Sequence, residues 1–180
     1  MALRNLLSAE RIAILVEPGN RAAVLDAAAQ LLAEPAAGSC GFTSGSRSSP
    51  TSSPTVSCPT LTSAIGDRLS EREQLASTAI GHGVAVPHAR IDGIDESRCA
   101  FLRLAQPIDF NAADGEPVDL VLALAVPVHH VQQHLELLAE LAETFADPTY
   151  RADLRAAPSI DLLRRRLLDD DHPLPTEAPA

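Results

Sequence analysis

Hydrophobic and polar positions follow two different periods in the first fifth of the chain. A short apolar run rich in β-branched residues, Ile12–Val16, is typical of a strand. Apolar residues then recur at helical spacing over Arg21–Leu32, and Asn20 stands where a helix N-cap is favoured. This part of the chain predicts a strand followed by a capped helix. The residues expected on the inward face of that helix are Val24, Leu25, Ala28, Leu31 and Leu32.

The pattern stops abruptly after Glu34. From Pro35 to Ser63, 21 of 29 residues are Ser, Thr, Pro or Gly, without a periodic apolar pattern. Such a segment buries too little apolar surface to offset its ordering entropy, so we expect a flexible loop at about residues 35–60. Two origins are open: a native insertion, or a stretch at 36–59 translated from a shifted frame of GC-rich coding DNA. Translation in the other two frames would distinguish them, because only a frameshift leaves a hidden amphipathic stretch there.

Regular patterns resume after this segment and alternate between strands and helices. A helix over Thr62–Gln74 places Ile65, Leu69 and Arg72 along one side. A long helix over His130–Ala146 is expected to bury its apolar stripe, and the acidic, Pro-rich residues 169–180 are expected to be disordered. Interleaved strands and helices indicate one α/β domain over residues 1–168, a helix-flanked sheet. The other expected elements are a Gly-punctuated turn with a short strand, Gly81–His88, strands Cys99–Leu104 and Val118–Val126, a helix beginning near Pro148 and a helix capped by Ser159. The expected apolar stripe of the long helix is Val131, Leu135, Leu138, Leu141, Ala142 and Phe145.

Composition narrows the classes of function. Hydrophobic residues make up 46% of the 180 residues, which is enough for a core, but aromatic residues make up only 3%. The net charge of −10 argues against nucleic acid and anionic membranes as partners, because both require a basic footprint. No apolar run approaches the length of a membrane helix, and charged residues interrupt the N-terminus, so no signal peptide is expected. The three cysteines, Cys40, Cys58 and Cys99, have no metal spacing and suggest reduced thiols in the cytoplasm.

His88 is the first candidate for chemistry. It ends the string GHGVAVPH, in which two glycines allow close backbone approach and Pro87 fixes one dihedral angle before the imidazole. A rigid, partly exposed imidazole at a strand end suits a nucleophile. The same pattern also fits a loop histidine that only packs. Spacing alone leaves both readings open.

Other polar residues have a functional and a structural reading as well. His134 shares a helix face with leucines and, on pattern alone, is more simply a core residue. With His130 it also forms an i, i+4 pair that could bind zinc, but the Glu of the metalloprotease signature is missing. Arg72 could bind phosphate oxygens as a planar fork or only be solvated. Ser77 and Thr78 could donate to the same anion or cap a turn. Cys99 lies in a predicted strand and is expected to be a small buried hydrophobic residue.

Three strings together carry a resemblance to a known family. They are LSEREQLASTAIGHGVAVPHAR, AQPIDFNAADGEPVDLVLALAVPV and HLELLAELAETFAD, and the match covers Leu3–Glu34 and about Thr60–Leu168. The chain resembles the IIA component of the bacterial phosphotransferase system, of the fructose–mannitol type, and is closest to the nitrogen-regulatory IIA proteins. The resemblance implies a mixed sheet flanked by helices. Residues 36–59 match nothing in the family, where this connection is short.

The resemblance also implies roles for particular residues. His88 would accept the phosphoryl group, with Nε2 favoured, although the residues alone do not fix the tautomer. His134 would be the second active-site histidine, and Arg72 an anion-binding residue. Thr78, Gly81 and Gly83 are further candidates for phosphate binding. No metal, nucleotide or other cofactor is expected.

Three functions remain in view. In the first, the chain is a cytoplasmic regulatory phosphocarrier that accepts phosphate from an HPr-like protein and controls target proteins, such as a sensor kinase or an ion transporter, by its phosphorylation state. In the second, it is a sugar-transport IIA component that passes phosphate to a IIB domain. In the third, it is a binding module that works without phosphorylation. The resemblance of LRNLLSAERI to stand-alone regulatory proteins favours the first.

Overall fold

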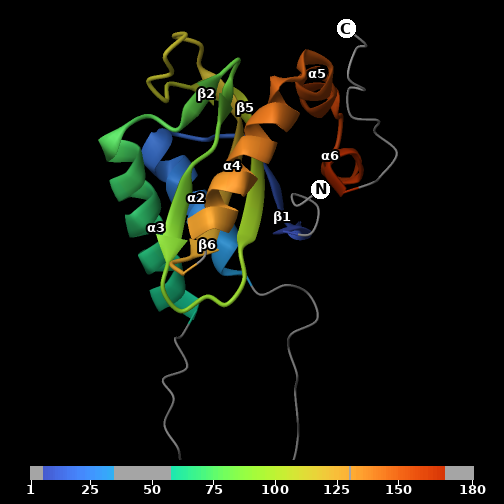
Figure 1. Cartoon of the computed structure of the whole chain (residues 1–180). Helices are drawn as coiled ribbons and strands as arrows, with labels where there is room; N and C mark the ends of the chain where they lie inside the picture. Colours follow the sequence, from blue (N-terminus) through green and yellow to red (C-terminus); the bar gives the residue numbers. More distant parts are fainter. Residues whose placement is uncertain (1–5, 35–57, 130, 169–180) are drawn as a thin grey trace, which may run out of the picture.

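Helices cover both faces of a six-stranded sheet in the computed structural model of the chain (Figure 1). The structure describes residues 6–34, 58–129 and 131–168. Its strands are β1 (Leu7–Leu15), β2 (Ala79–Gly81), β3 (Val84–Ala85), β4 (His88–Ile91), β5 (Arg98–Ile108) and β6 (Val118–Pro127). Its helices are α2 (Arg21–Ala33), α3 (Cys58–Leu75), α4 (Val131–Ala146), α5 (Pro148–Ala156) and α6 (Ile160–Leu168).

The sheet is mixed, as the resemblance implied. Its order is β1-β5-β6-β3-β2, and β4 also pairs with β6 beyond the end of β3. Strand β5 runs antiparallel to β6, whereas β3 and β4 both run parallel to it. Nine of the ten residues of β6 are buried, which is typical of a strand covered on both faces. Strand β6 is thus the scaffold that sets the register of β3 and β4.

The two faces of the sheet carry two separate cores. Alternation along β6 sends Val121 and Ala123 toward α2 and α3, and Leu122 and Leu124 toward α4, α5 and α6. On the second face the ring of Phe145 lies 6.2 Å from that of Phe101 and 5.6 Å from that of Tyr150. Of the four described aromatic residues, three therefore lie where α4 and α5 pack, and Phe110 lies in the other core. None of the helices in the described ranges is long and apolar enough to cross a membrane.

The sequence predictions are confirmed for most elements. Asn20 caps α2, with its Oδ1 accepting a hydrogen bond from the Ala23 amide at 2.9 Å. Strand β1 starts five residues before the predicted Ile12, and α3 starts at Cys58, inside the segment expected to be a loop. Residues 35–57 and 169–180 lie outside the described residues, and so do the predictions made for them.

The single strand predicted over Gly81–His88 is wrong. The chain reverses at His82 and Gly83, whose φ angles are 56° and 76°, and forms the short hairpin β2–β3. Pro87 then interrupts the sheet, because it has no amide hydrogen for a ladder. His88 consequently begins a new strand, β4, instead of ending an old one.

The inward face of α4 also differs from the prediction. Leu137, Leu141 and Phe145 are buried, whereas Leu135 and Ala142 are exposed. The leucine-rich string LELLAEL offers two overlapping stripes, and the pattern does not reveal which of them meets the sheet. The rotation observed buries Leu137 and directs Leu135 toward solvent.

Several arginines are used inside the fold, where they bind helix carboxyl ends. Arg151 Nη1 donates to the carbonyls of Phe145 and Ala146 at the end of α4, at 2.6 and 2.8 Å. Arg103 Nη1 donates to the Leu154 and Ala157 carbonyls around the end of α5. Carbonyls at a helix C-terminus have no partner within the helix, and a cation there also interacts favourably with the negative end of the helix dipole. Arg11 and Arg98 bind the end of α2 in the same way, through the carbonyls of Glu34 and Leu32.

Cys99 is a fully buried thiol in β5, as expected. Burial raises the pKa of its thiol to about 12. The thiol stays protonated at neutral pH and packs as a small hydrophobic group. The side chains of Cys40 and Cys58 are outside the described ones.

Candidate functional site

His88 is the first residue of β4 and lies opposite Leu124 in the register with β6. Its Nδ1 lies 2.9 Å from the carbonyl oxygen of Val86, two residues earlier. A carbonyl can only accept, so this contact places the imidazole proton on Nδ1. The ring is half-buried. Its orientation is therefore fixed by backbone that immediately precedes it.

Arg72 approaches the other nitrogen of the same imidazole. It comes from the last turn of α3, and its Nε donates to His88 Nε2 at 3.1 Å. Its Nη1 donates to the Ala76 carbonyl at 3.0 Å, which holds the guanidinium in place. An arginine Nε–H can only donate, so Nε2 must carry the lone pair. The two contacts agree on one tautomer, with a proton on Nδ1 and a nucleophilic Nε2.

The surroundings keep this imidazole neutral. Burial lowers the pKa of His88, and the charge of Arg72 lowers it further, whereas the Val86 carbonyl and the charge of Glu73 raise it. The net result is a pKa below the ordinary value of 6.5. A neutral imidazole is the form that can attack an electrophile.

We expect the proton titration of His88 to show this directly. In ¹⁵N NMR of the folded chain its midpoint should fall below 6.5, and in urea it should return to about 6.5. Because the unfolded chain then binds the proton more readily, this group's contribution to stability is intact above pH 6.5. That contribution should decrease as the pH falls from 6.5 to the folded-state pKa. A folded-state midpoint at or above the urea value would contradict the environment described here.

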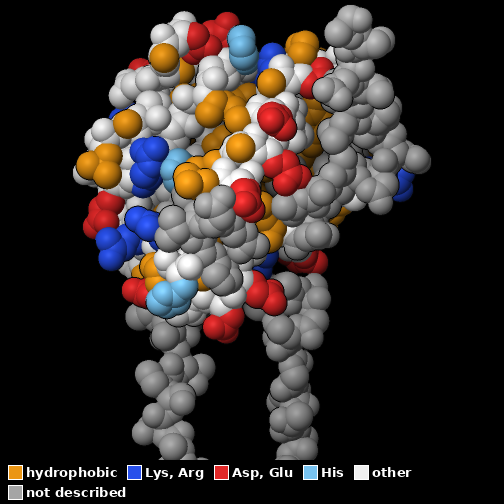
Figure 2. Space-filling model, in the orientation of Figure 1, with side chains coloured by type: hydrophobic (Ala, Val, Ile, Leu, Met, Phe, Trp, Pro, Cys, Tyr) orange, Lys and Arg blue, Asp and Glu red, His pale blue; other side chains and the backbone are white. Residues whose placement is uncertain are grey.

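An open pocket of about 740 Å³ lies beside His88 and Arg72. Two leucines on its rim are unusually exposed, Leu75 at 84% and Leu135 at 57%. Figure 2 shows arginine side chains gathered over α3, while acidic side chains predominate over α4. The site is thus open to solvent, and its lining has a small excess of positive charge, three arginines against two carboxylates, on an acidic protein. The lining residues are Ala64, Arg68, Glu71, Arg72, Leu75, His88, Ala89, Arg90, Ile91, Asp92, Val128 and Leu135.

His134 lies in the first turn of α4, but its side chain is outside the described ones. Its neighbour Leu135 lines the pocket, so the start of α4 borders the site. His130 also lies outside the described residues, which leaves the proposed zinc pair without a structural account.

The three phosphate-binding candidates are not brought to the imidazole. Along β6, the register pairs Val84 with Leu120 and His88 with Leu124, so Gly83 lies about 13 Å or more from His88. Thr78 is buried, and its hydroxyl donates to the Glu73 carboxylate at 2.5 Å. None of Thr78, Gly81 and Gly83 lines the pocket. Ser77 donates to the Phe110 carbonyl instead of facing the site.

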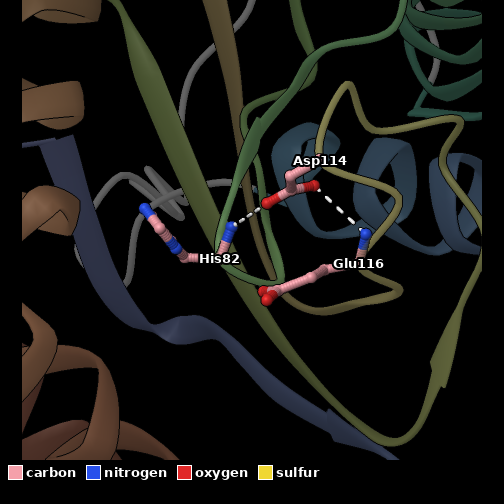
Figure 3. A group of neighbouring side chains, drawn as sticks. All are labelled: His82, Asp114 and Glu116. Carbon is pink, nitrogen blue, oxygen red and sulfur yellow. Dashed lines mark hydrogen bonds between the residues drawn. The ribbon is translucent and has the colours of Figure 1, made fainter.

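The glycine turn is instead held by side chains from other elements. The carboxylate of Asp114 accepts from the His82 amide at 2.8 Å and from the Glu116 amide at 3.1 Å, as Figure 3 shows. These two bonds lower the pKa of Asp114, the one from His82 most strongly. Within the described ranges, His82, Asp114 and Glu116 are the one group of three such side chains close enough to consider for a metal ion, and all three are exposed. The Asp114 carboxylate is occupied by backbone donors, and the His82 imidazole points away from it (Figure 3). In this group the Asp114 carboxylate anchors the turn through the backbone amides of His82 and Glu116.

The other side of the turn is held by an ion pair. Arg155 donates through Nε and Nη2 to both oxygens of Asp119, each at 2.7 Å, and Nη2 also reaches the His82 carbonyl at 2.7 Å. A Cβ at Gly83 would stand 2.5 Å from Arg155 Nη2 and 2.9 Å from Asp119 Oδ1. Glycine is favoured here by its φ of +76°, and any larger residue would also displace the ends of the Arg155 and Asp119 side chains.

Gly83→Ala is expected to destabilise the fold by about 3 kcal/mol, through left-handed strain and disruption of the Arg155 pair. Gly93→Ala is the matched control, since its φ is +81° but a Cβ there meets nothing within 4 Å. The control should cost only the strain, about 1 kcal/mol. Urea denaturation of the two variants measures the difference, and equal losses would show that the Arg155 contact contributes nothing.

Sequence reasoning missed three residues around the imidazole. Glu73 is buried next to Arg72, and Arg68 and Arg90 line the pocket. A signal existed for the arginines: Arg90 is two residues after His88 on a strand, and Arg68 is four before Arg72 on a helix, so each shares a face with a candidate. No comparable signal marked Glu73, which reads as one more charge on a polar helix.

Comparison with known proteins places this chain in a family. A family model described as "Phosphoenolpyruvate-dependent sugar phosphotransferase system, EIIA 2" matches residues 5–169. The nitrogen regulatory protein of Pseudomonas aeruginosa is 41% identical over 105 residues, which are 58% of this chain and 68% of that protein. The nitrogen regulatory protein of Escherichia coli K12 is 40% identical over 109 residues, 59% of this chain and 66% of that protein.

Solved structures agree with the sequence matches. The crystal structure of nitrogen regulatory protein IIA-Ntr from Neisseria meningitidis superimposes with a TM-score of 0.72 at 28% identity and covers 93% of this chain and 99% of that one. The mannitol IIA structure from Escherichia coli has a TM-score of 0.63 at 18% identity, covering 89% of this chain and 98% of that one, and shows the same fold. The chain therefore belongs to the type-2 EIIA family of the phosphoenolpyruvate-dependent sugar phosphotransferase system and is similar to its nitrogen-regulatory members.

Proposed function

We propose that this chain is a phosphohistidine carrier of a nitrogen-regulatory phosphotransferase system. It accepts a phosphoryl group from an HPr-like protein on Nε2 of His88 and regulates its partners by its phosphorylation state. One observation carries this proposal: the imidazole presents a Nε2 lone pair within 3.1 Å of the Arg72 guanidinium, while Nδ1–H is held by the Val86 carbonyl. The nucleophile and a charged donor for the incoming phosphoryl oxygens thus meet in an open pocket.

The transfer exchanges one nitrogen–phosphorus bond for another. The Nε2 lone pair of His88 attacks the phosphorus of a phosphohistidine on the donor, and that donor's nitrogen leaves with the bonding pair. The proton on Nδ1 stays where it is, and the Val86 carbonyl stabilises the positive charge that develops on the ring. The step is nearly balanced in energy, so transfer runs in both directions.

Catalysis here consists of positioning and electrostatics. Phosphoryl transfer passes through a loose transition state with charge on the equatorial oxygens. Arg72 would move its hydrogen bond from Nε2 to those oxygens as the new bond forms, and its tether to Ala76 keeps it within reach. We propose His134, at the start of α4, as a second donor to the phosphoryl group. The scheme uses no metal ion or nucleotide.

Phosphorylation changes the surface that partners meet. By analogy with other phosphorylated residues it adds about −1.5 to −2 charge at the site. The added charge falls in a pocket whose lining carries three arginines and two carboxylates, Glu71 and Asp92, and it exceeds this small positive excess. Partners that recognise the two states differently can thereby be controlled without a large conformational change.

A sugar-transport role is the second candidate. The description of the matching family model names a sugar phosphotransferase system, so the same histidine could pass its phosphate to a IIB domain. Genes for a nitrogen sigma factor beside the coding gene would favour the regulatory role, and permease genes the transport role. Incubation of the phosphorylated chain with a fructose-type IIB domain would show directly whether transfer occurs.

The experiment that tests the proposal is intact-mass spectrometry at alkaline pH. The chain is incubated with phosphoenolpyruvate, enzyme I and the HPr-like carrier of the same organism, with a known IIA protein as the positive control. We expect one acid-labile phosphoryl adduct, mapped by fragmentation to the peptide that carries His88. With the control phosphorylated, an unmodified chain would overturn the proposal in favour of a binding module that works without phosphorylation.

A further inference from the structure

The residue after Arg72 is a buried carboxylate that the transfer scheme does not use. The side chain of Glu73 is only 3% exposed. It accepts hydrogen bonds from the Thr78 amide at 3.0 Å and from the Thr78 hydroxyl at 2.5 Å. Its other oxygen lies 3.5 Å from Arg21 Nη1 on α2. Burying a charged carboxylate is costly, so its bonds indicate a specific structural task.

That task concerns the loop between α3 and β2. Glu73 clamps this loop, residues 76–78, because its carboxylate accepts from both the amide and the hydroxyl of Thr78. Two of its carbonyls hold other segments. The Ala76 carbonyl accepts from Arg72 Nη1 at 3.0 Å, and the Thr78 carbonyl accepts from the Val86 amide at 3.0 Å. The position of this loop therefore affects both the Arg72 guanidinium and the backbone at Val86.

Arg72 and Val86, the two residues held by this loop, both contact the imidazole of His88. Arg72, held by Ala76, donates to His88 Nε2 at 3.1 Å. Val86, held by Thr78, accepts from His88 Nδ1 at 2.9 Å. A closed ring of contacts thus runs from Glu73 through the loop to each nitrogen of the imidazole. A displaced loop would disturb both partners of His88 together.

We infer that Glu73 is a positioning residue for phosphoryl transfer, which acts through Thr78 to fix the tautomer of His88 and the guanidinium of Arg72. Its carboxylate does not touch the imidazole or the incoming phosphate. Thr78, expected from sequence to bind phosphate, acts on the same clamp from inside the fold. The part of this inference that concerns transfer rates rests on the function proposed above, and the part that concerns the tautomer does not.

Substitutions on the two sides of the clamp test the inference. Glu73→Gln weakens the charge-assisted bonds and Thr78→Val removes only the hydroxyl bond, whereas Thr78→Ser keeps it. We expect the first two variants to lose about tenfold to a hundredfold in phosphorylation rate, because small misplacements of reacting groups have effects of this size. Thr78→Ser should stay near the wild-type rate. Asp67→Asn, an exposed carboxylate of the same helix outside the pocket, is the matched control and should be unchanged.

The ¹⁵N shifts of His88 in the unphosphorylated chain provide a readout that loss of stability alone would not change. Below the unfolding midpoint of each variant, the wild type and Thr78→Ser should show one Nδ1–H tautomer, and Glu73→Gln and Thr78→Val a mixture. A single tautomer and wild-type rates in both clamp variants would overturn the inference. If the wild type itself is not phosphorylated, the proposed function fails, but the tautomer measurement still decides the role of Glu73.

Discussion

His88→Ala is expected to lose the phosphoryl adduct completely. The reason is that Nε2 of His88 is the nitrogen that meets an arginine in the pocket while its ring proton is held elsewhere. Catalysis by positioning depends on the attacking atom, so removal of the imidazole removes the step itself. The measurement is intact-mass spectrometry of wild type and variant side by side, with the same donor proteins.

Two other histidines serve as controls for this result. His82 lies on the hairpin turn away from the pocket, so His82→Ala should be phosphorylated at the wild-type rate. His134→Ala should still form the adduct, more slowly, if His134 only assists. An adduct that persists in His88→Ala and disappears in His134→Ala would move the nucleophile to α4 and contradict the roles proposed here.

The fold could be predicted to the extent that its patterns are local. The VDLVLALAV string of β6 is one continuous apolar run, and the apolar repeat of α2 follows a capping residue, so each marks its element locally. The GHGVAVPH string failed as one strand because its shape depends on a reversal at His82 and on Asp114 and Arg155, which lie far along the chain. Long-range anchors of this kind leave no period in the sequence.

For the candidate site, the sequence named two residues that the structure brings together, but it did not predict the geometry around them. Motif resemblance selected His88 and Arg72, which the structure places in hydrogen-bond contact. The same resemblance suggested phosphate binding by Gly81 and Gly83, yet β6 separates the hairpin from the imidazole by four residues of register. Glu73 escaped notice because its importance lies in burial and in its bonds to Thr78, and neither can be deduced from a polar helix.

Arg72→Ala is expected to slow phosphorylation of His88 by about 10²- to 10³-fold, which is the usual effect of removing one donor to a transition-state oxygen. Arg72→Lys should recover only part of this loss. Its single ammonium cannot hold the Ala76 carbonyl and also present a planar fork to the phosphoryl group. Rapid-quench measurement of adduct formation at saturating donor isolates the chemical step from docking.

A second readout separates this electrostatic role from damage to the fold. The charge of Arg72 lowers the pKa of His88, so its removal should raise the NMR titration midpoint toward, but not beyond, the value in urea, since burial still opposes protonation. Arg165→Ala, an exposed arginine on α6 outside the pocket, removes the same formal charge and should leave both the rate and the midpoint unchanged. A raised midpoint with an undiminished rate would mean that Arg72 tunes the imidazole without stabilising the transferred phosphoryl group. An unchanged midpoint would instead contradict the 3.1 Å contact on which the site is built.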